Sequence, residues 1–553
     1  MFLVFVIFSL VGFLLFLGWT ILASKKNSGT SRIPSIGLAV FFILFLGSLI
    51  LIEGADKNVT ALKGESAVAQ PKIEEKKPAD KQPQLEEKKP EEDQPKTEEK
   101  TEIPEEKRVE IVNGPGSKTR GPANPKYVMD VKYDSAKHVI SGTMSVEFVN
   151  NTDVDLNNLY FNVWGNAQVF LANTKKDANV EVDQVKVNGQ PVSHTLDGTA
   201  LHIPDVSIKK TEKAKVEMNF SVTIPEGEDR FAWNKTTTSL GNWFPILAVY
   251  DDEGWNVDPY FPSGESFYSL TGDFDVTFTT EKEQVIATTG TEVDEPTING
   301  ALATHRYKAE NVRDFAMEMD PTYKIKQAKA GNVNINVFYK EDHVKYVDAM
   351  LNAGTKSISL FSEKFGQYPW PELDICAMEG WFGGMEYPQL VMITIAPEIQ
   401  VAGVGSTTAH EIGHQWFYGI IGNNEYDEPW LDESFASFAQ MLHDGLDQTP
   451  FRIDNARLGD SHLSHSIEKF KDKGKEGIFS YYNMVYRYGA KTVDDLRKEL
   501  GDEQFYASMQ AYFNEMKFGV STTTDFIRIM EETSKRDLDK FFEEHRVSVS
   551  DQQ

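Results

Sequence analysis

Hydrophobic and polar residues follow three different patterns along the chain, and each pattern covers its own stretch. Residues 2–22 and 33–52 are almost wholly apolar, and each stretch is long enough to span a bilayer as a helix. Between residues 122 and 320 apolar residues recur at every second position, as they do over residues 216–224, which is typical of half-buried strands. From His343 onward the spacing becomes helical. The pattern predicts an apolar N-terminal part, an all-β part and an α+β part.

The two apolar stretches have the features of a helical hairpin in a membrane. The loop between them carries three basic residues, whereas the chain after the second stretch begins with Glu53 and Asp56. Because basic loops stay in the cytoplasm, both ends of the hairpin should face outward. A cleaved signal peptide is the alternative, but no basic residue precedes the first stretch and a second span follows. We expect a cell-membrane protein with two spans in residues 1–52, in contact with the membrane through residues 2–52, and with its remaining residues extracellular.

Residues 53–121 are dominated by Pro, Glu, Lys and Gln and contain loose repeats, at residues 73–78, 85–90 and 96–100. A segment so poor in apolar side chains cannot offset the entropy lost on ordering, so we expect a disordered tether. A helical stalk is the alternative, and the regularly placed prolines count against it. The tether would hold the folded parts away from the membrane.

Two folded parts are expected after the tether, because the chain has 553 residues and one hydrophobic core rarely serves that many. Residues 122–320 are predicted to be an all-β domain, a sandwich or an open saddle. Residues 321–553 add strands near 333–337 and 390–395, and helix patterns dominate the remainder. This second part is predicted to be an α+β domain.

Charge and cysteine content narrow the function classes. The net charge is −28 and the pI is near 4.9, which argues against nucleic acid as a partner, since phosphate backbones are bound by clusters of Lys and Arg. Cys376 is the single cysteine in the sequence. The chain can therefore form neither an internal disulfide nor a cysteine-based metal site.

The strongest chemical signal is a pair of histidines four residues apart, His410 and His414, with Glu411 directly after the first. On a helix this spacing puts both imidazoles on one face, as two ligands of one zinc ion require, and it lets Glu411 act on the attacking water. Glu433 follows nineteen residues after His414 and supplies a third ligand. The extended signature with a third histidine does not apply, because position 420 holds Ile420. We expect one Zn2+ per chain.

Four segments together resemble the aminopeptidase N family of gluzincin zinc metallopeptidases, whose catalytic domain is thermolysin-like. In chain order they are Gly383-Gly-Met-Glu-Tyr387, His410-Glu-Ile-Gly-His414, Glu433 in a Trp-Leu-x-Glu-x-Phe-Ala setting, and Tyr486-Arg-Tyr-Gly-Ala490. The similarity runs from Val312-Arg-Asp-Phe315 to about residue 505. Upstream it is weaker and rests on strand pattern and on phrases such as Gly241-Asn-Trp-Phe-Pro245.

The resemblance implies a role for each matching residue. His410, His414 and Glu433 would hold zinc, and Glu411 would take the proton of the water and pass it to the leaving amine. Tyr486 would donate a hydrogen bond to the oxyanion that forms during hydrolysis, a contact worth about 3 to 4 kcal/mol in comparable sites.

Tyr482 and Tyr488 are the alternatives to Tyr486 in this role, because several tyrosines crowd the same segment.

The resemblance also implies which end of a peptide is cut. Gly383, Gly384 and Met385 would hold the substrate backbone along an exposed strand edge, and glycines allow the close approach. Glu386 would bind the free α-ammonium of the substrate through a charge-assisted contact. Endopeptidase substrates lack that ammonium, so aminopeptidase activity is the implied reading.

The chain departs from the family pattern at several positions. Tyr387 stands where the family usually has Asn, which would reshape the first specificity pocket. Asp432 replaces a more usual Asn, and Tyr488 replaces a usual Lys. The second acidic group that many members supply from the β domain is not identifiable from the sequence. Only about 120 residues follow Glu433, so we expect an open cleft, with room for longer peptides or for a partner protein that covers it.

The sequence therefore predicts a membrane-anchored zinc metallopeptidase that acts on peptides or proteins, most simply an aminopeptidase that releases N-terminal residues. Two alternatives stay open. One is a zinc endopeptidase with an open cleft, and the other is a surface module that binds peptides on the same fold. The second alternative gives no reason for Glu411, because binding needs no general base.

Overall fold

The protein is described from a computed structural model, in which the described residues are 120–167, 180–261, 264–380, 382–396, 399–445, 453–471 and 474–548. All of them belong to one compact unit. The two predicted membrane spans, and the predicted tether as far as residue 119, lie outside the described residues. Within the described part of the chain, no helix combines the length and the apolar character that a membrane crossing needs.

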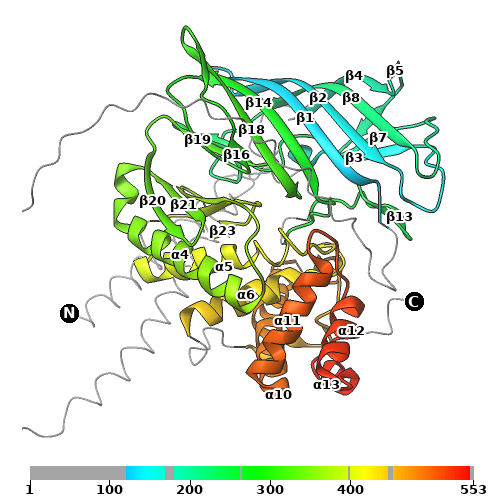
Figure 1. The fold of residues 1–553 in the computed structure, drawn as a ribbon, viewed down its shortest axis with the longest axis vertical. Coiled ribbons are helices and arrows are strands. Elements are labelled where there is room, and N and C mark those ends of the chain that lie inside the picture. The colour runs from blue at the N-terminus through cyan, green and yellow to red at the C-terminus, as the bar shows by residue number, and fades with distance from the viewer. Residues whose placement is uncertain are drawn as a thin grey trace, which may run out of the picture. The chain divides into compact units, whose positions relative to one another are not determined.

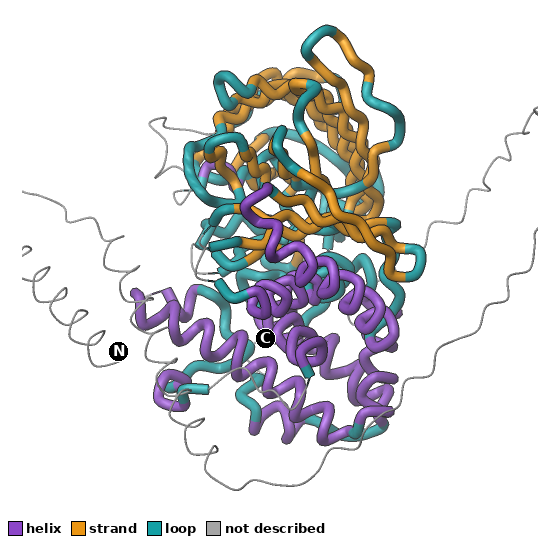
Figure 2. The backbone as a smooth tube through the Cα atoms, turned by 90° about the vertical axis from the view of Figure 1, so that its left-hand side faces the viewer, coloured by secondary structure: helices purple, strands orange, loops and turns teal. Residues whose placement is uncertain are grey.

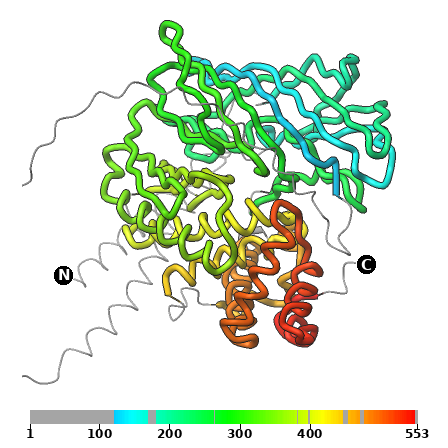
Figure 3. The backbone as a smooth tube through the Cα atoms, viewed as in Figure 1, coloured from blue at the N-terminus to red at the C-terminus, as the bar shows by residue number. Residues whose placement is uncertain are grey.

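Strands fill the first half of this unit and helices dominate the second, as the colour order in Figure 1 and Figure 3 shows. Figure 2 separates the same two halves by structure, with the strands gathered above the helices. A sheet-rich N-terminal domain followed by a largely helical region is what the sequence pattern predicts.

The large sheet has the strand order β16-β18-β14-β1-β2-β8-β4-β5, with β17 pairing to β18. Its strands are β1 (Ala123–Asp134), β2 (Val139–Val149), β4 (Val180–Val187), β5 (Gln190–Pro191), β8 (Lys213–Thr223), β14 (Gly272–Glu281), β16 (Thr291–Glu292), β17 (Thr297–Asn299) and β18 (Leu302–Val312). The alternation seen in the sequence puts one face of each long strand into the core. In β8, for example, Val216, Met218, Phe220 and Val222 are buried.

Three smaller sheets complete the sheet-rich domain. The first is β9 (Phe231–Asn234), β10 (Thr237–Leu240), β15 (Val285–Thr288) and β19 (Met317–Asp320); the second is β3 (Leu159–Asn162), β6 (Thr195–Asp197), β7 (Ala200–Ile203) and β11 (Ile246–Leu247); the third is β12 (Tyr250–Asp251) and β13 (Gly254–Trp255). A short 3-10 turn, η1 (Trp164–Asn166), lies among them.

A mixed sheet follows, with the strand order β20-β21-β22-β24-β23. Its strands are β20 (Lys324–Ala330), β21 (Val333–Tyr339), β22 (Glu372–Met378), β23 (Gly384–Met385) and β24 (Leu390–Thr394). β22 lies inside the sheet, and β23 lies at its edge, antiparallel to β24. Cys376 is buried in β22, inside the sheet.

Helices cover the mixed sheet and continue to the end of the described chain (Figure 1). They are η2 (Glu341–Tyr346, 3-10), α4 (Val347–Lys364), α5 (Val401–Gly413), α6 (Trp430–Asp444), α7 (Asn455–Leu458), α8 (Glu468–Lys471), α9 (Gly474–Tyr481), η3 (Tyr482–Tyr488, a π-helix), α10 (Gly489–Leu500), α11 (Asp502–Met516), α12 (Thr523–Ser534) and α13 (Asp539–Glu544). α4 packs on α5, and α5 packs on α6. This packing brings the histidine-bearing helix beside the helix that begins at Trp430.

Candidate metal centre

Two packed helices bring the three predicted zinc ligands to one point. His410 lies in the last turn of α5 and His414 at its C-terminal end, while Glu433 lies in the first turn of α6. The Nε2 atoms of the two histidines are 3.2 Å apart, and Oε2 of Glu433 lies 3.4 Å from Nε2 of His410 and 3.2 Å from Nε2 of His414. The spacing of four residues thus places both imidazoles on one face of α5.

This donor set fits a zinc ion. Ligand atoms about 2.0 to 2.1 Å from a tetrahedral ion lie about 3.3 Å from one another, which matches the three separations. Oε2 of Glu433 is buried and has no hydrogen-bond partner, so it is available as a ligand. Two imidazoles and one carboxylate, with a fourth position for water, are a usual donor set of catalytic zinc.

The ligands are held in place by their neighbours. Nδ1 of His414 lies 3.2 Å from the backbone carbonyl oxygen of Phe417, so it can donate its proton there and leave Nε2 to face the metal. The second carboxylate oxygen of Glu433 accepts a hydrogen bond from the Tyr486 hydroxyl. The Glu433 backbone N–H donates to Asp432, whose carboxylate also accepts from Asn423.

Tyr486 lies at the metal centre and its two alternatives do not. Its ring stacks 5.9 Å from that of His410, and its hydroxyl reaches Glu433. Tyr482 packs on Tyr486 but is 42% exposed, and Tyr488 has Arg546 and Asp495 as its charged neighbours. All three belong to η3, in which the wider π-turn changes which residues share a face.

The predicted substrate segment runs past the same point. Gly384 and Met385 form β23, and Glu386 follows directly. Ligand-type atoms of Glu386, Glu411 and His414 all lie within 4.8 Å of one another. Gly384 packs against Glu411 so closely that a Cβ there would overlap the carboxylate. The structure thus brings together every predicted site residue except Gly383, which lies at the start of the segment with a φ of 93° and no neighbour at its Cβ position.

The centre is rich in buried negative charge. Burial raises the pKa of Glu386 to about 8, and burial together with the charge of Glu386 raises the pKa of Glu411 well above its usual range. Burial also acts to raise the pKa of Glu433, but the neighbouring His414 and His410 outweigh it and lower the pKa to about 2. A divalent cation held by His410, His414 and Glu433 would supply positive charge against these carboxylates.

Sequence reasoning missed an ion pair that borders the site. Arg230, just before β9, contacts both carboxylate oxygens of Glu265 at 2.6 and 2.7 Å, and its Nη1 also lies 2.7 Å from the sulfur of Met385. The negative charge of Glu265 contributes to the raised pKa values of Glu386 and Glu411. Glu265 therefore lies close to Glu386 and Glu411. It is a candidate for the second acidic group that the resemblance leads one to expect from the β domain.

Gln415 was missed as well, although it directly follows His414. Its side-chain amide donates to the carbonyl oxygens of Glu386 and Tyr387 at 3.3 and 3.0 Å, and its Oε1 accepts from the Gln389 N–H at 2.8 Å. Gln415 thus links the C-terminal end of α5, the zinc helix, to residues 383–387, the predicted substrate segment. The position of Gln415 directly after the histidine motif was the available signal.

A histidine–glutamate metal centre beneath the edge strand of a mixed sheet, beside a sheet-rich domain, defines the class as a gluzincin-type zinc metallopeptidase fold. Comparison with known proteins agrees. Residues 349–545 match the Peptidase family M1 domain. This match, the aminopeptidase N relatives and the solved M1 zinc metallopeptidases support an aminopeptidase N-like family, which implies a single catalytic zinc.

Aminopeptidase N of Lactococcus lactis subsp. lactis (strain IL1403) is 22% identical over 431 residues, which are 68% of this chain and 49% of that protein. The probable aminopeptidase 2 of Sulfurisphaera tokodaii is 28% identical over 229 residues, 37% of this chain and 29% of that protein. The chain thus spans about half the length, or less, of these relatives. The M1 zinc metallopeptidase from Deinococcus radiodurans shares the fold, with a TM-score of 0.55 and 14% identity over 77% of this chain and 94% of that one.

Proposed function

We propose that this protein is a zinc aminopeptidase that hydrolyses the first peptide bond of peptides with a free N-terminus. The observation that carries the proposal is the position of Glu386, a buried carboxylate at the end of an edge strand, within 4.8 Å of Glu411 and His414. The names of the L. lactis and S. tokodaii relatives support the same activity.

The distance between Glu386 and the zinc ligands favours cleavage at the end of a peptide over cleavage inside it. An α-amine and the carbonyl carbon of the same residue are about 2.5 Å apart, which follows from the standard backbone bond lengths. A substrate whose ammonium pairs with Glu386 therefore has its first carbonyl, and not a later one, beside Glu411 and the zinc ligands. Glu265 of the sheet-rich domain is a candidate second acidic group for the same ammonium.

The residues divide the chemistry among them. When bound, zinc supplies a Lewis acid that lowers the pKa of a water and polarises the scissile carbonyl. Glu411 accepts the proton of the attacking water and delivers it to the leaving amine. Tyr486 donates its hydroxyl proton to the oxyanion, and in doing so it exchanges its present contact with Glu433 for one with the substrate.

The first experiment compares one peptide with a free and with an acetylated N-terminus, using the zinc-loaded protein. We expect cleavage of the free form alone, one residue from its end. In Glu386→Gln, kcat/KM for the free form should fall about 10- to 100-fold, the equivalent of a lost charge-assisted hydrogen bond. Glu379→Gln is the matched control, because this carboxylate pairs with Lys340 away from the metal centre.

Other outcomes assign the protein to another class. Equal cleavage of both peptides at internal bonds would indicate an endopeptidase that uses the same metal centre. Binding of the peptide without turnover, in protein that contains zinc, would indicate a peptide-binding module. Glu411→Gln separates these two further, since it should abolish turnover and retain zinc only if Glu411 is the general base.

We also propose that the protein is anchored in the cell membrane through residues 2–22 and 33–52, with the catalytic domain extracellular, and that a partner can cover its cleft. The apolar stretches and the basic loop between them support the anchor. Proteolysis of intact cells, followed by immunodetection of the catalytic domain, tests this. Protection from the protease until the cells are lysed would contradict an extracellular domain.

A further inference from the structure

Tyr387 links the substrate segment to the sheet-rich domain through a chain of buried hydrogen bonds. Its side chain is fully buried and its hydroxyl donates to Oδ1 of Asn242 at 2.7 Å. The Asn242 amide in turn donates to Oδ2 of Asp314 at 2.7 Å, and Oδ1 of Asp314 accepts from the Phe315 N–H at 2.7 Å. Asn242 follows β10 and Asp314 follows β18, so the chain of bonds connects two loops of one domain to the segment that follows edge strand β23 in the next.

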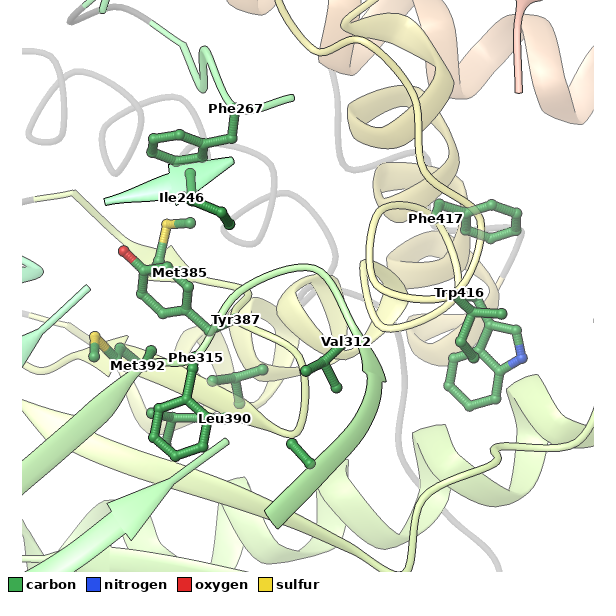
Figure 4. Close-up of a cluster of buried hydrophobic side chains, with 14 of the residues drawn as sticks. Ile246, Phe267, Val312, Phe315, Met385, Tyr387, Leu390, Met392, Trp416 and Phe417 are labelled. Carbon is green, nitrogen blue, oxygen red and sulfur yellow. The ribbon is translucent and has the colours of Figure 1, made fainter. Parts of the chain in front are cut away.

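The sheet-rich domain is shaped to receive this tyrosine. A Cβ at Gly241 would overlap the Tyr387 hydroxyl and ring, so the fit requires glycine at position 241. Figure 4 shows Tyr387 beside Met385, Met392 and Phe315 in the buried cluster where the two domains meet. The neighbouring residue Met385 is contacted from the same domain by Arg230.

The backbone next to Glu386 is held by further hydrogen bonds from Gln415 and Thr289. Gln415, at the end of the zinc helix, binds the carbonyl oxygens of Glu386 and Tyr387. The Thr289 hydroxyl, from the loop after β15, donates to the carbonyl oxygen of Pro388 at 2.8 Å. Gln415 fixes the segment to the metal centre, whereas Tyr387 and Thr289 fix it to the sheet-rich domain.

We propose that Tyr387 is a positioning residue for Glu386, which acts through Asn242 and Asp314 to set the distance between the amine-binding carboxylate and the metal centre. The inference rests on the proposed aminopeptidase function. It gives the sheet-rich domain a role in deciding that one residue, and not two, fits between Glu386 and the scissile bond. It also accounts for a tyrosine at a position where the resemblance leads one to expect asparagine, since only a long side chain with a terminal hydroxyl reaches Asn242.

The structure favours an effect on substrate binding over an effect on the chemical step. The Tyr387 hydroxyl donates to Asn242 and not to a zinc ligand, so its loss leaves His410, His414 and Glu433 as they are. The loss removes one of the hydrogen bonds that hold the segment carrying Glu386. The Glu386 carboxylate then moves among positions that bind the substrate ammonium less well. Discrimination between free and acetylated N-termini should therefore suffer first.

The test uses Tyr387→Phe, which removes the hydroxyl and keeps the buried ring, and Asn242→Ala, which removes the next member. The ratio of kcat/KM for the free peptide to that for its acetylated form is measured in the full-length, zinc-loaded protein. We expect the ratio to fall about tenfold in each variant, mainly through KM, because each variant removes the buried hydrogen bond between Tyr387 and Asn242. Because both residues act in one chain of bonds, the double variant should lose little more than either single variant.

A readout without turnover completes the design. In a Glu411→Gln background the Kd of the free-amine peptide should rise about tenfold on adding Tyr387→Phe, while zinc content stays constant. Tyr368→Phe is the matched control, since it also removes a buried hydroxyl, one that donates to the Glu372 backbone carbonyl at 3.2 Å. It should leave the ratio and the Kd unchanged.

Each outcome has one meaning. An unchanged ratio in Tyr387→Phe, or single effects that multiply in the double variant, would overturn the positioning role while the aminopeptidase function stands. An equal fall of this ratio in Tyr368→Phe would mean that the loss of any buried hydroxyl has the same effect through general destabilisation. That result would also overturn the positioning role of Tyr387. A wild-type protein that cleaves both peptides equally would instead refute the aminopeptidase function, and the positioning role with it.

Discussion

Gly384 lies in β23 directly against the Glu411 carboxylate, and any side chain at this position would occupy the same space. The Glu411 carboxylate is the end of a flexible side chain. A side chain at position 384 would therefore displace this carboxylate rather than disrupt the strand. The glycine is therefore needed for the position of Glu411, the proposed general base, more than for stability. A displacement of about 1 Å from productive geometry is enough to slow an enzyme about 100-fold.

Gly384→Ala should accordingly lower kcat about 100-fold, with zinc content and melting temperature close to those of the unmodified protein. Steady-state kinetics, metal analysis and thermal unfolding together check this expectation. Gly403→Ala is the control on the same helix as Glu411, because position 403 is exposed and has only Ile399 near its Cβ position, at 3.9 Å. Full activity in Gly384→Ala would show that Glu411 is not the base or does not occupy this position.

Single residues also show how far the sequence could lead. His410 and His414 are found from spacing alone, because helical periodicity turns distance along the chain into distance in space. Glu433 lies on another helix, and the sequence indicates it only through its place downstream of the histidine motif. Tyr387 and Asn242 are 145 positions apart, and Asn242 and Asp314 are 72 apart. No local period links such partners. The sequence shows Asn242 and Asp314 only within two separate short segments, 241–245 and 312–315, and gives no sign that they contact each other or Tyr387.

At the scale of elements, β19 carries a carboxyl group into the core beside the mixed sheet. Glu318 is fully buried, its Oε1 accepts from the Tyr323 hydroxyl at 2.9 Å, and its Oε2 has no partner. Burial raises the pKa of Glu318 to about 7, with Asp320 raising it further and Lys340 acting in the opposite direction. The strand thus holds this group in its protonated form over the weakly acidic range, up to about pH 7.

The direction of the resulting pH dependence follows from proton binding. Between about pH 4.5 and 7 the folded protein keeps the proton on Glu318 and the unfolded chain does not, so the free energy of unfolding falls as pH rises through this window. In Glu318→Gln, which cannot ionise, this part of the slope should vanish. Urea unfolding at several pH values from 4.5 to 8, with excess zinc, measures it.

The exposed Glu181 of β4 provides the control for this measurement, and Glu181→Gln should keep the original slope. An identical slope in Glu318→Gln and the unmodified protein would mean that Glu318 is charged in the folded state.

Element types were easier to predict than their internal geometry. Alternation identified strands such as β2, β8 and β14, and helical spacing identified α4, because each pattern follows from which face is buried. The π-helix η3 left no such signal. One wide turn shifts the register of Tyr486 against its neighbours without changing the residue types, so the tyrosine at the metal centre had to be chosen by resemblance.

At the scale of the whole molecule, the metal centre is the point where separate parts of the chain meet. α5 supplies His410 and His414, α6 supplies Glu433, and β23 brings Glu386 to the same place. The sheet-rich domain reaches this point through Arg230 and Tyr387. A bound zinc ion ties the two helices together and balances the surrounding carboxylates, so it should stabilise the fold as well as serve the reaction.

Removal of zinc should therefore lower the thermal stability of the protein. A ligand that binds only the folded state stabilises it by about 2.7 kcal/mol at a free concentration one hundred times its Kd, which is a few degrees in melting temperature. We expect a chelator to lower the melting temperature by that amount and added zinc to restore it, as followed by circular dichroism. Glu433→Ala separates this effect from unspecific action of the chelator, because it removes one ligand and should make the melting temperature nearly independent of zinc. The same chelator-induced fall in Glu433→Ala would place the stabilising metal at other residues, and His410 and His414 would then lose their role in stability.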